Sequence, residues 1–120
     1  MAANASMEKT APALADVVDT AHLGRYTMGD VKLERELLAM FSRQLEEIVS
    51  ALAATEDGGE WKLLAHTLKG AAMAVGAFPL AGTAKALEEA GPDAPGALRD
   101  ELARRAAAYQ AAWRRWDAAA

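Results

Sequence analysis

Apolar residues recur at steps of three and four positions along most of the chain. The clearest stripe consists of Leu37, Leu38, Phe41, Leu45, Ile48, Val49 and Leu52. Arg43, Glu46 and Glu47 lie between its members, so the segment has the period of an α-helix with one buried face. Strand-like alternation of β-branched residues is missing. The pattern therefore predicts an all-α protein.

Glycine and proline residues divide the remaining pattern into further helices. Breaks are predicted near residues 29–30, 57–59, 76–79 and 91–96, with Asp30 as an N-cap and Pro79 in the first turn of a helix. Four long helices with short links pack as an antiparallel four-helix bundle. A short additional N-terminal helix is predicted from about Pro12 to Tyr26. We expect a flexible tail over 1–12, the bundle domain over 13–117 and a tail over 118–120.

Composition and charge narrow the function. The chain has 120 residues, with 13 Lys and Arg against 17 Asp and Glu, so its formal net charge is −4. An acidic chain is a poor nucleic-acid binder. The absence of cysteine excludes disulfides, thiolate metal sites and cysteine nucleophiles. The hydrophobic fraction of 52% includes 31 alanines, and neither a membrane-spanning run nor a signal-peptide pattern is present. We expect a cytoplasmic protein that binds neither nucleic acid nor membrane.

His66 does not follow the apolar pattern of its helix, which is predicted from near Glu60 to near Gly76. At about 100° per residue, the apolar stripe of this helix leaves His66 on the opposite, solvent-facing side. The positions that share or flank this side are Lys62, Gly70, Met73, Ala74 and Ala77. A glycine inside a helix costs about 1 kcal/mol relative to alanine. One reason to accept that cost is the close approach of another backbone, so the patch predicts a docking surface.

The chemistry available to His66 is narrow. A neutral imidazole is a competent nucleophile near physiological pH, and the chain offers no Ser or Cys partner in a triad-like arrangement. His66 is therefore a candidate phosphoryl acceptor, with the Lys69 ammonium one turn away to offset charge. The alternatives are a merely solvated histidine, a helix–helix contact at Gly70 and a core-edge filler at Met73. His22, the second histidine, is expected to be a surface residue.

The segment AHTLKGAA, from Ala65 to Ala72, continues to residues 75–77 and strongly resembles the signature of histidine-containing phosphotransfer (HPt) domains. The resemblance extends over about residues 15–117. It implies that His66 carries a phosphoryl group, usually on Nε2, and exchanges it with an aspartate of receiver domains. It also implies that Lys69 supports the phosphoryl group and that Gly70 leaves room for the receiver.

Glu88 resembles the carboxylate that chemotaxis-type kinases place against the other nitrogen of the histidine, where it holds the tautomer and raises nucleophilicity. The neighbouring Glu89 is the alternative for this contact. The expected partners are receiver domains of response regulators or hybrid histidine kinases. We expect a monomeric phosphocarrier rather than an enzyme, with no metal or cofactor of its own and with Mg²⁺ on the receiver.

Two other functions remain open, namely an inert helical adaptor for a receiver-like partner and the phosphorylatable domain of a chemotaxis-type kinase. Met1 and the alanine-rich ending favour a complete short protein over the latter. A metal-binding bundle is disfavoured, because neither histidine has a glutamate three residues before it.

Overall fold

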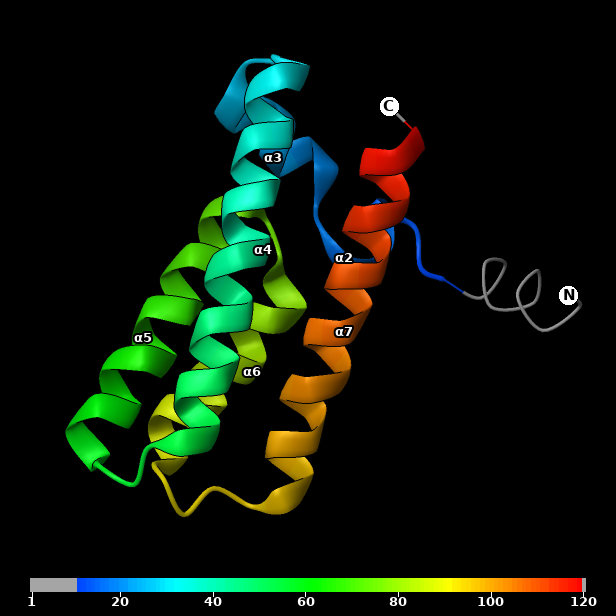
Figure 1. Cartoon of the computed structure of the whole chain (residues 1–120). Helices are drawn as coiled ribbons and strands as arrows, with labels where there is room; N and C mark the ends of the chain where they lie inside the picture. The colour runs from blue at the N-terminus through cyan, green and yellow to red at the C-terminus, as the bar shows by residue number, and fades with distance from the viewer. Residues whose placement is uncertain (1–10, 120) are drawn as a thin grey trace, which may run out of the picture.

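A computed structural model describes residues 11–119 (Figure 1), and among them the only regular elements are helices. The six helices are α2 (Leu14–Val17), α3 (Thr20–Thr27), α4 (Val31–Ala54), α5 (Gly58–Val75), α6 (Phe78–Ala90) and α7 (Gly96–Ala119). The predicted all-α class is confirmed. None of these helices is both long enough and apolar enough to cross a membrane.

The four long helices form a ring in which each packs against the next and α7 returns to α4. Their directions alternate, as Figure 1 shows, so they make the predicted antiparallel bundle. The short helices lie outside this ring. Helix α3 contacts α4 and α5 near one end of the bundle, and α2 packs on α7.

Two large aromatic residues fix the helices against one another inside the core. Trp61 on α5 is 1% exposed and donates from Nε1 to the Leu87 carbonyl of α6 at 2.7 Å. Tyr109 on α7 is fully buried and donates its hydroxyl to the Leu38 carbonyl of α4 at 2.8 Å. A buried donor without a partner would be costly, so these side chains fit in one helix register only. Trp61 thereby sets the register between α5 and α6.

Aspartate side chains begin two of the long helices. Asp30 accepts a hydrogen bond from the Leu33 amide at 3.1 Å, which confirms it as the N-cap of α4. Asp57 accepts from the Glu60 amide at 2.8 Å and caps α5. The cap allows α5 to begin at Gly58, two residues before the predicted start near Glu60.

The N-terminal region differs from the single helix predicted over Pro12 to Tyr26. Val18 is extended between α2 and α3, and Asp19 caps α3. The Asp19 amide donates to the Gly76 carbonyl at 2.8 Å. This contact joins segments far apart in the sequence, so local periodicity could not reveal the break. The predicted tail over 1–12 lies almost wholly outside the described residues.

The C-terminal helix is longer than predicted. It includes residues 118 and 119, which were expected to form a tail, and residue 120 lies outside the described part. Alanine is the best helix former, so these residues extend the helix without penalty. Arg35 of α4 anchors the same turn, with its Nε 3.7 Å from the Asp117 carboxylate.

Replacing Gly76 by alanine should destabilise the bundle. Gly76 has φ of +86°, and a Cβ built there would lie 2.9 Å from the Asp19 carbonyl oxygen. Both the left-handed backbone and the close approach disfavour a side chain, so Gly76→Ala should lower the free energy of unfolding by about 1–3 kcal/mol. Urea denaturation followed by circular dichroism measures this.

The matched control is Gly82→Ala in α6, because a Cβ at Gly82 meets nothing within 4 Å. This variant should be as stable as the wild type or more so. Equal stability of the Gly76 and Gly82 variants would contradict the tight contact at the end of α5.

Candidate functional site

His66 lies on the open side of α5, as its helical position predicts. Its side chain is 63% exposed, whereas Ala65 and Leu68 beside it are fully buried. The imidazole therefore stands clear of the core and can meet another protein.

The second side chain of the site comes from α6. The Glu88 carboxylate oxygen Oε2 lies 3.2 Å from Nδ1 of His66. An ionised carboxylate only accepts hydrogen bonds, so this contact assigns the imidazole proton to Nδ1. Nε2 of the neutral ring then carries its lone pair. The alternative Glu89 is exposed and has no such contact.

Lys69 completes the cluster from the turn of α5 that follows His66. Its ammonium nitrogen donates to the other Glu88 carboxylate oxygen, Oε1, at 2.9 Å. Glu88 and Lys69 are largely buried, at 16% and 26% exposure of their side chains. The carboxylate therefore holds the imidazole with one oxygen and the ammonium with the other.

The pKa of Glu88 is lowered from its ordinary value of 4.5. The hydrogen bond from Lys69 is the main cause; partial burial opposes it, while the Lys69 charge and the His66 contact add to it. Glu88 is therefore ionised at neutral pH. Because the pKa of Glu88 is lower in the folded protein than in the unfolded chain, the ionised carboxylate stabilises the folded state. This contribution is complete at a pH above the ordinary pKa of Glu88 and is lost as the pH falls through the lowered pKa.

The surface around His66 is open, and two alternatives to a docking surface are excluded: a helix–helix contact at Gly70 and a core-edge filler at Met73. A Cβ built on Gly70 meets nothing within 4 Å, so no contact among the described residues requires a glycine there. Met73 is 50% exposed, so it does not fill the edge of the core. Ala74 and Lys62 are also exposed.

Ala77 was wrongly placed on this surface, because it is fully buried. The prediction extended the helical period of α5 through residue 77. The helix instead ends at Val75, and Gly76 adopts the left-handed conformation that closes it. This reversal turns Ala77 inward as the N-cap residue of α6.

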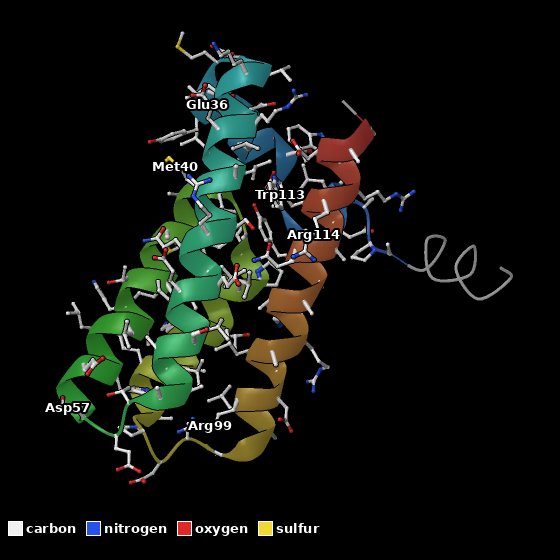
Figure 2. All side chains as sticks on the ribbon, viewed as in Figure 1. Glu36, Met40, Asp57, Arg99, Trp113 and Arg114 are labelled. Carbon is white, nitrogen blue, oxygen red and sulfur yellow. The ribbon has the colours of Figure 1, made fainter. Side chains whose placement is uncertain are left out.

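Two exposed apolar residues and one contact of His22 were not predicted. Leu63 is 65% exposed and lies three positions before His66, where its helical angle could have revealed it. Met40 is 57% exposed and projects from α4 on the side where α5 packs (Figure 2). His22 is half-buried, and its Nε2 is 3.2 Å from the Ala74 carbonyl oxygen. Nothing in the local sequence marks the contact of His22.

The family model described as "Hpt domain" matches residues 35–113 of the chain. This stretch covers more than half of the sequence, so the chain belongs to the Hpt domain family. Hpt domains are phosphocarriers rather than enzymes; they take part in histidine phosphotransfer within phosphorelays and interact with receiver domains. No curated protein and no solved structure gave a significant match.

Glu88 should control which ring nitrogen of His66 carries the proton. In the wild type, ¹⁵N NMR of the imidazole should show the Nδ1–H tautomer at a pH where the ring is neutral. Glu88→Ala removes the acceptor, so the ring should shift toward the Nε2–H tautomer common in free histidine. Glu89→Ala is the matched control and should leave the tautomer unchanged. An Nε2–H tautomer in the wild type would contradict the assignment.

Proposed function

We propose that this domain accepts a phosphoryl group on Nε2 of His66 and exchanges it with the aspartate of a receiver domain. The observation that carries the proposal is the contact between Glu88 and Nδ1, which leaves Nε2 as an exposed nucleophile. An oriented carboxylate keeps the ring in the reactive tautomer, and it stabilises the positive charge that the ring gains on attack.

The transfer needs no reactant besides His66 and the aspartyl phosphate of the receiver. The Nε2 lone pair attacks the phosphorus of an aspartyl phosphate, the N–P bond forms, and the O–P bond to the aspartate breaks. The released electron pair regenerates the receiver carboxylate, while the imidazole proton stays on Nδ1 against Glu88. The reverse reaction uses the same atoms, so this geometry does not set the direction of phosphoryl flow.

Lys69 supplies the positive charge that the moving phosphoryl group needs. An ammonium has three donors, and only one of them is required by the Glu88 contact. The others can bind phosphoryl oxygens as charge builds up in the transition state. As the family resemblance implies, we expect the receiver to bring Mg²⁺.

The docking face that we propose for the receiver surrounds His66. From the sequence it includes Lys62, Gly70, Met73 and Ala74; Leu63 and Met40 extend it as exposed apolar residues. A smooth surface of small and apolar side chains allows a folded partner to approach the helix backbone closely. Because one receiver would dock on one copy of this chain, we expect the protein to act as a monomer. We expect it to act in the cytoplasm, where response regulators act.

A second candidate is the phosphorylatable domain of a chemotaxis-type kinase, which the Glu88–His66 contact favours. Phosphotransfer profiling separates the candidates. The chain is incubated with phosphorylated receivers of the source organism, and in parallel with ATP and a kinase catalytic domain of the chemotaxis type. Rapid label from a receiver supports the relay, rapid label from the kinase supports the second candidate, and no label from either leaves an inert adaptor.

His66→Gln should abolish labelling while leaving the fold intact. The glutamine cannot form the N–P bond, and the position is exposed, so the free energy of unfolding should change by less than about 1 kcal/mol. Acid-labile label and thermal melting measure the two effects. His22→Gln is the matched histidine control and should retain the label. A large loss of stability in His66→Gln would contradict the exposed placement.

Gly70→Gln should weaken receiver docking and leave the chemistry intact. The new side chain has free space within the domain but obstructs a partner at this face. The receiver concentration at half-maximal rate should rise about tenfold or more, equivalent to about 1.4 kcal/mol of docking energy. Labelling of His66 by phosphoramidate, a small donor that needs no docking, should be unchanged. An unaltered receiver dependence would remove Gly70 from the docking face.

A further inference from the structure

The end of α5 is held by a side chain from another helix. The last carbonyls of a helix have no N–H group of their own helix to bind. At this end, the Gly76 and Ala77 amides satisfy the Met73 and Ala72 carbonyls. The Ala74 carbonyl is met instead by His22 of α3, whose Nε2 lies 3.2 Å from the oxygen.

His22 is itself fixed in place from several sides. Its backbone amide donates to the Asp19 carboxylate at 3.0 Å, in the first turn of α3. Its ring meets Phe78 edge-on, with 5.2 Å between the ring centroids. Its Cδ2 atom would lie 3.2 Å from a Cβ on Gly76, a tight contact, and the Asp19 carbonyl oxygen would lie closer still, at 2.9 Å. The first turn of α3 and the turn between α5 and α6 therefore form one interlocked unit.

This unit ends at the proposed docking face. Ala74 lies eight residues beyond His66, which is about 12 Å along the helix. Met73 and Ala74 are exposed on the last turn of α5, a place where helices commonly fray. A hydrogen bond to the Ala74 carbonyl restrains that turn. The His22–Ala74 hydrogen bond does not involve the cluster of His66, Lys69 and Glu88, whose members contact one another.

We propose that His22 is a positioning residue for receiver docking, which acts by holding the last turn of α5 through the Ala74 carbonyl. The inference rests on the proposed function, because it concerns the same docking face. His22 lies outside the stretch that the family model matches, so the role belongs to this chain's own N-terminal segment. It affects how well a receiver binds and leaves the reactivity of Nε2 unchanged.

Two amide variants separate this role from a general packing role. Glutamine places its side-chain nitrogen close to Nε2 of a histidine and can still donate to Ala74, whereas asparagine is too short to reach it. His22→Asn should raise the receiver concentration at half-maximal rate about two- to tenfold, with the maximal rate and the phosphoramidate rate unchanged. His22→Gln should restore the wild-type value. Thr20→Ala, an exposed change on the same helix, should have no effect.

Amide hydrogen exchange provides a readout that does not depend on a receiver. The Gly76 and Ala77 amides close the end of α5, so they should exchange faster in His22→Asn than in His22→Gln or the wild type. Hydrogen exchange also shows why docking is weaker if His22→Asn melts at a lower temperature. A global loss of stability accelerates exchange in every helix, whereas the proposed role of His22 accelerates it at the end of α5.

The inference and the proposed function fail differently. Equal docking and equal exchange in the two amide variants would overturn the role of His22 while leaving phosphotransfer intact. A slower phosphoramidate reaction in His22→Asn would also overturn it, since the effect would then reach the nucleophile. If no receiver labels the wild type, the proposed function fails, and the docking role of His22 falls with it.

Discussion

The packing of α5 against α6 is the constraint on which the site depends. The proposed nucleophile, His66, is on one helix and the carboxylate that contacts it is on the other, so a shift of one residue between the helices would separate the pair. The buried hydrogen bond from Trp61 to the Leu87 carbonyl resists that shift, because it fixes the residue directly before Glu88. An unpaired indole N–H in the core would cost more than a misplaced surface contact. Core packing thus sets the geometry of a group that is itself exposed.

The helical period predicted much of the fold and one side of the site. Apolar stripes gave the bundle, an aspartate before a stripe gave the cap of α4, and the exposure of His66 followed from its angle on α5. The position of Glu88 depended on family resemblance, since periodicity does not state which face of α6 meets α5. The local sequence also left Glu89 as an alternative, and only the packed structure separates the two.

The errors of prediction occur where the chain reverses or makes long-range contacts. Ala77 was placed on the docking face because the period of α5 was carried past Gly76, whose left-handed backbone ends the helix. The contact of His22 was not predicted, because its partner, the Ala74 carbonyl, lies 52 positions away. The break between α2 and α3 depends on a similar bond between Asp19 and Gly76. Periodicity contains no information on such contacts.

In the proposed function, a carboxylate beside the phosphoryl acceptor creates an electrostatic conflict, which Lys69 reduces. Glu88 favours the reactive tautomer, but its negative charge would repel an incoming phosphoryl group. The ammonium of Lys69 bonds to the same carboxylate, so the pair is neutral overall, and the repulsion is reduced without loss of the contact to Nδ1. The carboxylate and Nε2 lie on opposite sides of the imidazole ring, which separates the two negative charges further. In the proposed function, Lys69 therefore has two roles that need one position: it compensates the charge of Glu88 before transfer, and it is already in place for the phosphoryl oxygens during transfer.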